Sequence, residues 1–495
     1  MFRVAFVYPG YENLGIEYLS ATLKKRGIQT KLFFDPVLFS ESGFLSNRFL
    51  GKLFSFQKYL LREIINYKPD LVCFSVVTDN YPWAIRWARE IKYSLGTLII
   101  FGGIHPTALP ERVLNEPFVD YVCIGEGDIA LAELAAAMKE KMPVTRIKNI
   151  WTKNDSLIIK NEVRPLIPNL DDLPFPDKDL YYLSASIFRE GYLITTSRGC
   201  PHSCTYCANN LLRNIYQGRG DYLRRRSVSN VIAEMEKAKV EYKPRFIHFS
   251  DEVFSYDTEW LESFIPIYRK NIGLPFACYV SPPFVNKKVV GLLKEGGCYK
   301  VQMGVQTLNE DSRIKLLKRV YTNEQIIEAI KLFRKHKIYL TCDNIFGLPG
   351  QDEDELIEMS EFYNKNRPDH IEVFWLKYYP AAPILSIARN MGWVDDNNIK
   401  AMESSAIGIV KGGDTYNREF GRFQLLLNLL YFMPTKLVSF ILRKGIYRLF
   451  PLLSPICITI LFRLFNRARF DLYAAMTVRR YIHMIKRKAL FIFRA

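Results

Sequence analysis

Three cysteines within eight residues, Cys200, Cys204 and Cys207, are the residues of this chain best suited to chemistry. Thiolates in one short loop can bind three corners of a cube-shaped iron–sulfur cluster and leave its fourth iron without a ligand from the loop. A structural zinc ion would need a fourth ligand, and His202 lies too close to the cysteines in sequence to supply it easily. The spacing therefore favours a [4Fe-4S] cluster with one open iron over zinc or three unrelated core cysteines.

The cysteine loop directly follows the first of six short apolar runs, and helical patterns separate most of these runs. Parallel strands joined by helices predict an open or partial (β/α)6 barrel whose chemistry lies where the strands meet the following loops. The six runs are Leu193–Thr196, Phe246–Phe249, Phe276–Val280, Val301–Gly304, Leu340–Phe346 and Ile371–Phe374.

The first 145 residues also alternate apolar runs with amphipathic stretches. Buried strands separated by helices predict a doubly wound, Rossmann-like parallel sheet with both faces covered. Ligands of such sheets bind beyond the carboxyl ends of the strands. The predicted strands are Arg3–Tyr8, Leu71–Val76, Leu98–Phe101 and Tyr121–Ile124.

Glycines and hydroxyl side chains follow three of these predicted strands. Glycine lets the backbone approach a bulky ligand, and short hydroxyl side chains offer hydrogen bonds. The alternative is that these segments are ordinary turns of a flavodoxin-like domain. The candidate binding residues are Ser75 and Thr78, then Gly102, Gly103 and His105, and then Gly125 and Glu126.

The cysteine loop, with the aromatic Tyr206 before its third cysteine, resembles that of the radical S-adenosylmethionine (radical SAM) superfamily. The resemblance implies that S-adenosylmethionine chelates the open iron. It also implies that an electron from a donor such as flavodoxin or ferredoxin cleaves this molecule to a 5′-deoxyadenosyl radical.

Four further residues match family segments that contact S-adenosylmethionine. Asp251 lies in an acidic segment after the second strand, and Gly304 lies in a Gly-x-Glu-like segment in which Gln306 replaces the usual glutamate. Arg319 has the planar, two-pronged guanidinium that suits the cofactor carboxylate. The alternative for Arg319 is a solvated helix arginine.

The order of an N-terminal doubly wound domain, a Pro/Asp-rich linker and a barrel resembles the cobalamin-binding branch of this superfamily over residues 1–385. The resemblance implies that the three glycine- and hydroxyl-bearing loops bind cobalamin. The Asp-x-His-x-x-Gly motif of histidine-ligated cobalt is absent, so we expect no histidine on cobalt and a nucleotide tail inserted into the sheet. His105 then lies near that tail or is structural. Loss of cobalamin binding stays open as an alternative.

The sequence thus predicts four regions. Residues 1–145 form the cobalamin-binding domain, 146–190 a linker, 191–385 the radical SAM barrel, and 386–495 a helical, basic C-terminal region. Only three acidic residues accompany the sixteen Lys and Arg residues of 411–495. Leu, Phe and Ile mixed with Arg in this way are typical of an interfacial segment attracted to anionic lipid. The alternative is a helical cap on the barrel, and nucleic acid is disfavoured because no known binding module is present.

The predicted activity is a cobalamin-dependent C-methyltransferase acting on an unactivated carbon of a small or lipid-like substrate. The alternatives are a cyclase or rearrangement enzyme of the same branch, and a non-catalytic metal- or corrinoid-binding protein at the membrane. A methylthiotransferase-like enzyme would carry further cysteine sets. The sequence identifies no catalytic side chain, and isolated cysteines such as Cys278, Cys298 and Cys342 read as core. Without a signal sequence, we expect a cytoplasmic protein, peripheral on the inner face of the membrane.

Overall fold

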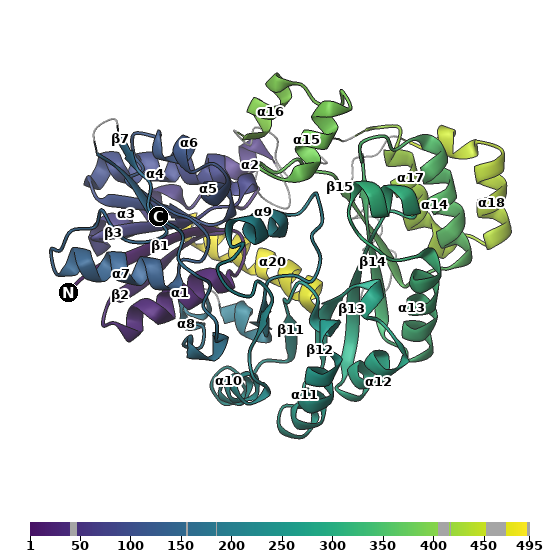
Figure 1. Cartoon of the computed structure of the whole chain (residues 1–495), viewed down its shortest axis with the longest axis horizontal. Coiled ribbons are helices and arrows are strands. Elements are labelled where there is room, and N and C mark those ends of the chain that lie inside the picture. The colour runs from purple at the N-terminus through teal and green to yellow at the C-terminus, as the bar shows by residue number, and fades with distance from the viewer. Residues whose placement is uncertain are drawn as a thin grey trace.

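The computed structural model describes residues 1–39, 47–154, 157–184, 186–403, 415, 417–451 and 472–492. Two α/β units lie side by side, with helix α9 between them and the C-terminal helices on the outside (Figure 1). Each unit is built on its own sheet and its own hydrophobic core.

The first unit is a seven-stranded sheet in the order β2-β1-β3-β4-β5-β6-β7, whose first five strands are parallel. This arrangement confirms the predicted doubly wound domain. Its strands are β1 (Arg3–Pro9), β2 (Gln29–Asp35), β3 (Leu71–Ser75), β4 (Leu98–Gly102), β5 (Tyr121–Cys123), β6 (Ile150–Asn154) and β7 (Leu157–Ile159). Its helices are α1 (Leu14–Lys25), α2 (Arg48–Leu53), α3 (Gln57–Tyr67), α4 (Tyr81–Leu95), α5 (Ile104–Ala108), α6 (Pro110–Leu114) and α7 (Asp128–Lys139).

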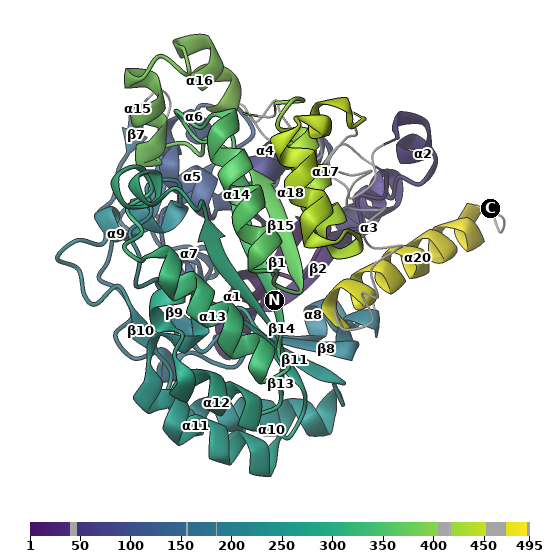
Figure 2. The ribbon, with the colours of Figure 1, turned by 90° about the vertical axis from the view of Figure 1, so that its right-hand side faces the viewer.

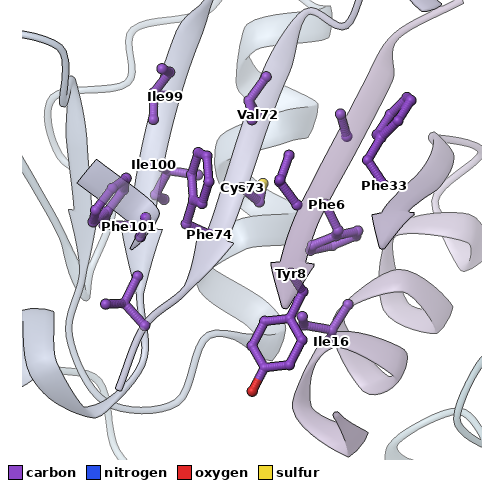
Figure 3. Close-up of a cluster of buried hydrophobic side chains, with 14 of the residues drawn as sticks. Phe6, Tyr8, Ile16, Phe33, Val72, Cys73, Phe74, Ile99, Ile100 and Phe101 are labelled. Carbon is purple, nitrogen blue, oxygen red and sulfur yellow. The ribbon is translucent and has the colours of Figure 1, made fainter. Parts of the chain in front are cut away.

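Near-continuous apolar strands produce this buried sheet. Phe6, Phe74 and Phe101 come from β1, β3 and β4 and are almost completely buried (Figure 3). Strands covered on both faces need apolar residues at successive positions, whereas strands with one wet face alternate. The apolar runs in the sequence therefore sufficed to predict the parallel core of this domain.

The predicted linker at 146–190 is wrong in its first part. β6 and β7 pair antiparallel to each other, and β6 pairs antiparallel to β5, so residues 150–159 extend the first sheet. Ile150 and Thr152 are buried while Trp151 and Lys153 are half-buried, which is the alternation of an antiparallel strand with one covered face. Such short, mixed strands resemble loop sequence, which explains the error.

The remainder of this stretch packs against both domains and contains the short helix α8 (Asp179–Tyr182). Lys178 is 1% exposed, and its ammonium group lies 2.8 Å from both Glu12 and Glu17 of the first domain. It also donates to the carbonyl of Leu193 in the second domain. A buried charge is tolerated only when it is paired, so this side chain ties the two domains together.

The second unit is a six-stranded parallel sheet in the order β15-β14-β13-β12-β11-β8, which confirms the predicted partial barrel. A two-stranded ladder of β9 and β10 stands beside it. The strands are β8 (Gly191–Ile194), β9 (Ser197–Arg198), β10 (Arg224–Arg225), β11 (Phe246–Phe249), β12 (Phe276–Val280), β13 (Cys298–Gln306), β14 (Tyr339–Phe346) and β15 (His370–Trp375). The helices are α9 (Ala208–Ile215), α10 (Val228–Glu241), α11 (Thr258–Asn271), α12 (Lys287–Glu295), α13 (Asn323–Lys335) and α14 (Glu353–Lys365).

The described part of the C-terminal region is helical, as predicted, and its helices lie on the outside of both units (Figure 2). α17 and α18 pack against α14 of the barrel, whereas the Tyr481 hydroxyl of α20 accepts a hydrogen bond from the Phe39 amide of the first domain. None of the helices in the described ranges is both long and apolar enough to cross a membrane. The helices are α15 (Pro383–Asn390), α16 (Asp396–Glu403), α17 (Gly421–Leu429), α18 (Thr435–Arg443) and α20 (Leu472–Ile492).

The buried ion pairs of Lys178 lead to a first prediction. Replacing Lys178 with Met leaves Glu12 and Glu17 buried without their cation and should destabilise the protein by about 3–5 kcal/mol. Lys24→Met removes a half-exposed ion pair to Asp177, with side-chain exposure of 47% on the lysine, and should cost under about 1 kcal/mol. Thermal unfolding of the two variants measures the contrast, and equal melting temperatures would show that the buried ion pairs do not hold the domains.

Candidate functional site

A cavity of about 420 Å³ lies between the two domains, where the carboxyl ends of their strands face each other. From the first domain it is lined by Ser75 and by the glycine-rich loops after β4 and β5. From the second domain it is lined by residues before and after the cysteine loop: Thr195, Ser197, Arg198, Gly199, Asn209, Tyr216 and Tyr222. The cavity therefore joins the two regions that the sequence selected independently.

Part of the cavity lining is apolar. It consists of Phe6, Cys73, Phe74 and Ile100 of the first sheet, together with Leu19 of α1 and Leu131 of α7. The loops after β4 and β5 form a glycine-rich rim, where the wall is mainly backbone because Gly102, Gly103, Gly125 and Gly127 have no side chains. Apolar strand residues beside a glycine-rich rim suit a corrinoid whose ring contacts backbone and whose tail enters the sheet.

Thr107 holds the two glycine loops together. Its hydroxyl donates to the carbonyl of Gly103 at 2.7 Å and accepts from the amide of Gly125 at 3.0 Å. Gly103 has a φ of +101°, and a Cβ there would lie 2.7 Å from the carbonyl oxygen of Val76. The backbone of this rim therefore requires glycine at 103.

Thr78 and His105 lie behind the cavity wall. His105 is fully buried, its ring packs 4.1 Å from that of Tyr81, and its Nδ1 is 3.2 Å from the Thr78 hydroxyl. Burial, assisted by Arg112, lowers the pKa of His105 to about 4, so the ring is neutral at pH 7. Of the two alternatives for His105, this geometry favours the structural one.

The cysteine loop is held by hydrogen bonds to its backbone and sulfurs. The Arg213 guanidinium donates to the carbonyl of Cys200 at 2.5 Å, and the Asn209 amide donates to the sulfur of Cys207 at 3.6 Å. Cys200 and Cys204 are buried and Cys207 is half-buried. Burial raises the pKa of Cys200 to about 12 and also raises that of Cys207, so these groups become thiolates only when a metal neutralises them.

The geometry also bears on the zinc alternative. Within the ranges that the structure describes, no three His, Cys, Asp or Glu side chains converge on a point where one metal ion could bind. A mononuclear site needs such convergence. The cysteines of a cubane cluster each bind a different iron, so their sulfurs stand apart around the cube.

Arg319 brings four of the predicted residues together. Its guanidinium lies 3.5 Å from the Cys204 sulfur, 3.5 Å from the Tyr206 hydroxyl and 3.0 Å from the Gly304 carbonyl. Only 6% of Arg319 is exposed, so the alternative of a solvated arginine is wrong. Gln306 follows a β-bulge at a φ of +71°, and a Cβ on Gly304 would lie 2.5 Å from its amide nitrogen.

Asp251 braces the turn before the cysteine loop. Its carboxylate accepts hydrogen bonds from the amide and hydroxyl of Thr196 and from the hydroxyl of Ser197, at 2.5–3.1 Å. Asp251 is 1% exposed and is not among the residues that line the cavity, whereas its neighbour Glu252 is. The acidic segment is therefore at the site, with Asp251 buried beneath it.

Sequence reasoning missed Asp343 on β14, which pairs with Gly304 of β13 in the sheet. Gln302 donates to both carboxylate oxygens of Asp343, at 3.0 and 2.9 Å. Burial raises the pKa of Asp343 to about 8, so it is mostly protonated at pH 7. The available signal was one acidic residue within a mostly buried strand.

Comparison with known proteins agrees with this geometry. The model of the B12 binding domain matches residues 3–135, and that of the radical SAM superfamily matches residues 194–363. The chain therefore carries a B12 binding domain followed by a radical SAM domain. The cofactors of these two domains are a [4Fe-4S] cluster with S-adenosylmethionine, and cobalamin, as the sequence predicted.

Three curated relatives of the enzyme carry names from two reaction classes. An uncharacterized methyltransferase of Pyrococcus horikoshii is 26% identical over 67% of this chain and 72% of its own. The hopanoid C-3 methylase of Methylococcus capsulatus is 23% identical over 70% of this chain and 63% of its own. An anaerobic magnesium-protoporphyrin IX monomethyl ester cyclase of Cereibacter sphaeroides is 24% identical over 80% of this chain and 65% of its own.

Two solved structures share the fold. The cobalamin-dependent radical enzyme OxsB has a TM-score of 0.68 at 16% identity and covers 99% of this chain and 83% of its own. The radical S-adenosylmethionine methyltransferase TsrM of Kitasatospora setae has a TM-score of 0.62 at 18% identity and covers 79% of this chain and 76% of its own. The fold of this enzyme is therefore that of cobalamin-dependent radical enzymes.

The cavity rim leads to a second prediction. Gly125 has a φ of +69°, and a Cβ there would lie 2.0 Å from the Tyr216 hydroxyl, so Gly125→Ala should cost strain and force the two domains apart. Gly218 has a φ of +71° with nothing within 4 Å, so Gly218→Ala should cost only the backbone strain of about 1–3 kcal/mol. Hydroxocobalamin binding, measured by absorbance, should weaken at least tenfold for Gly125→Ala alone. Equal weakening in both variants would show that contact across the rim is not involved.

Proposed function

We propose that this enzyme is a cobalamin-dependent C-methyltransferase that acts on an unactivated carbon of a small or lipid-like substrate. One observation supports this most strongly: the glycine-rich rim of the B12 binding domain and the residues flanking the cysteine loop line the same cavity. A methyl carrier and a radical source in one enclosed chamber suit the transfer of a methyl group to carbon.

We propose Cys200, Cys204 and Cys207 as the cluster ligands. For S-adenosylmethionine we propose Arg319 and its neighbours Tyr206, Gly304 and Gln306, because the guanidinium lies beside the Cys204 sulfur. Arg319 presents a fixed cation to the cofactor carboxylate. Asp251 is proposed to act through the Thr196–Ser197 turn, which it holds directly before the loop.

For cobalamin we propose the rim residues Ser75, Gly102, Gly103, Gly125 and Glu126, all of which line the cavity. Thr78 and His105 are proposed to support this rim from behind, where they contact each other. When bound, the cluster with S-adenosylmethionine supplies a hydrogen-abstracting radical, and cobalamin supplies the methyl group. The protein's own task is to orient the reactants and to exclude water. Tyr216, Tyr222 and Arg198 line the cavity at the domain boundary, and we propose them for this task.

Because one relative is named a cyclase, cyclisation is the second candidate activity. Cyclisation and methylation by this cavity differ in whether carbon from the S-adenosylmethionine methyl group ends in the product. Both need a one-electron reductant, for which we propose a flavodoxin or ferredoxin.

A third prediction tests the cluster. Cys204→Ala should lose most of its iron and lower 5′-deoxyadenosine formation at least about a hundredfold, since a two-cysteine loop no longer holds three corners of the cube. The matched control is Cys298→Ala, a buried cysteine of β13 that is 2% exposed and lies outside the loop. It should keep its iron and form 5′-deoxyadenosine within about twofold of wild type, apart from a core-packing cost of roughly 1–2 kcal/mol.

Anaerobic reconstitution followed by iron analysis and chromatography of the nucleoside provides the measurement. Full iron content and turnover in Cys204→Ala would reject the cluster assignment.

We also propose that the enzyme works at the inner face of the cytoplasmic membrane, through the outer surface of α18. Val438, Ile441 and Leu442 of α18 are buried against the barrel, whereas Leu437 and Phe440 are 44% and 47% exposed. The apolar residues Phe432 and Leu449 flank the helix and are 52% and 82% exposed. Lys436, Arg443 and Lys444 are exposed on the same helix or at its end, and residues 420–451 contain no acidic residue. Apolar side chains among cations suit an anionic lipid surface.

A fourth prediction tests this surface. Leu437→Glu combined with Phe440→Glu should weaken binding to vesicles of phosphatidylcholine and phosphatidylglycerol at least tenfold, because it removes apolar burial and adds repulsion. The control combines Tyr93→Glu and Val240→Glu, two residues of α4 and α10 that are 83% and 76% exposed. Co-sedimentation measures binding, and a wild-type enzyme that stays in the supernatant would end the membrane proposal.

A further inference from the structure

The four residues Gly125–Asp128 lie at the junction of β5 and α7, between the cavity and the second domain. We call this segment the shared wall. All four residues line the cavity in which we place the corrinoid. The same segment is contacted by side chains of the second domain that flank the cysteine loop: Arg198 before it and Tyr216, at the end of α9, after it.

Before the loop, the contact is an ion-pair cluster. Arg198 precedes Gly199 and Cys200 directly, and its guanidinium binds both carboxylate oxygens of Asp128, at 2.8 and 3.0 Å. The side chains of Arg198 and Asp128 are 20% and 6% exposed. Paired nitrogens on paired oxygens fix direction as well as distance, and burial shields the pair from screening by salt. The start of the loop is therefore anchored to the shared wall.

A second arginine supports the first. Arg224 lies opposite Arg198 in the β9–β10 ladder, and its guanidinium donates to Glu126 at 2.6 Å and to the carbonyl of Ile167 at 2.7 Å. Arg198 also lies 3.4 Å from Glu126. The buried Arg224 and the part-buried Arg198 thus meet two carboxylates of the shared wall.

After the loop, the contact is a tyrosine. Cys207 leads directly into α9, and Tyr216 stands at the end of that helix. Its hydroxyl accepts a hydrogen bond from the Glu126 amide at 2.6 Å, and its ring occupies the space that a side chain at 125 would need. Both ends of the segment that carries the three cysteines are therefore attached to the same four residues.

We propose that the shared wall couples the corrinoid site to the cluster site, with Arg198, Arg224 and Tyr216 as positioning residues. A ligand in the cavity touches the wall from one side and so selects one wall position. Through these contacts, the selected wall position selects one position of the cysteine loop. The coupling is reciprocal, because a change in one site's affinity caused by the other must act equally in both directions. The proposal rests on the proposed function, in which corrinoid and cluster are both bound.

The test measures coupling without any substrate. In anaerobically reconstituted full-length enzyme, the dissociation constant of S-adenosylmethionine and the EPR spectrum of the reduced cluster are recorded with and without saturating hydroxocobalamin. In wild type, hydroxocobalamin should tighten S-adenosylmethionine binding by about 5-fold to 150-fold, the usual range for coupled sites, and should alter the EPR spectrum. In Arg198→Gln, hydroxocobalamin should still bind. It should then change the dissociation constant of S-adenosylmethionine by less than twofold and leave the EPR spectrum of the reduced cluster unaltered.

Two further variants separate coupling from damage to the fold. Arg198→Gln leaves Asp128 buried without its partner, so Arg198→Gln combined with Asp128→Asn removes both charges and should fold while remaining uncoupled. The control is Arg112→Gln, which breaks another ion pair between two regions of the chain, to Glu403 of α16 at 2.7 Å, and this pair contains no residue of the shared wall or of the cysteine loop. It should couple as wild type does.

The outcomes are distinct. Independent binding of the two cofactors in wild type overturns the inference and leaves the proposed function intact. Equal loss of coupling in Arg112→Gln and Arg198→Gln also overturns it, because the effect would then belong to any interdomain ion pair. Failure of wild type to bind a cluster or hydroxocobalamin rejects the proposed function itself.

Discussion

Buried charges between the two domains determine where the reaction chamber lies. Lys178 meets Glu12 and Glu17, and Arg226 of the barrel meets Glu234 at 2.6 Å while reaching the Tyr18 hydroxyl of α1 at 3.3 Å. Withdrawing such groups from water is costly unless each finds its partner, so the domains gain stability only in the arrangement that pairs them all. In that arrangement the carboxyl ends of two parallel sheets face each other across one cavity. Each sheet has its ligand edge at this end for reasons of topology alone, and the charges bring the two edges together.

Neighbouring side chains hold the cysteine loop in place, while burial disfavours bare thiolates at Cys200 and Cys207. Burial raises the pKa of Cys200 and Cys207, and no opposite charge within the loop compensates. Hydrogen bonds from Arg213, Asn209 and Arg319 instead fix the backbone and sulfurs. The loop is therefore a site whose charge balance is completed by iron and whose shape is set by its neighbours.

The sequence predicted the features that depend on nearby residues. Apolar runs of strand length, the glycine-rich loops and the three-cysteine spacing are local, and the two-domain order follows from them. The sequence did not predict contacts between residues that are distant along the chain. Arg198 and Asp128 are seventy residues apart, and nothing in either segment points to the other. Lys178 read as part of a linker, although its partners lie more than 150 residues away.

Side-chain direction was equally invisible in the sequence. Ser75 and Thr78 are neighbours in one loop, yet Ser75 lines the cavity and Thr78 turns inward to His105. Glu126 was predicted to bind cobalamin, and it does line the cavity, but its carboxylate is held by Arg224 and Arg198. Periodicity assigns a residue to a strand or loop, whereas packing against the second domain decides which way its side chain points.

Arg319 carries one more consequence. Its guanidinium bonds to groups from three other stretches of the barrel, at Tyr206, Ser281 and Gly304, and to its near neighbour Tyr321. A long, flexible side chain normally loses much rotamer freedom when it grips a ligand. In this protein Arg319 loses its rotamer freedom on folding, because its hydrogen bonds fix the guanidinium. A carboxylate can therefore bind it without a further loss of side-chain entropy. Because these hydrogen bonds join several stretches of the barrel, a shift in any of them would displace the Arg319 guanidinium. Carboxylate binding would then weaken under conditions in which the hydrophobic core is still folded.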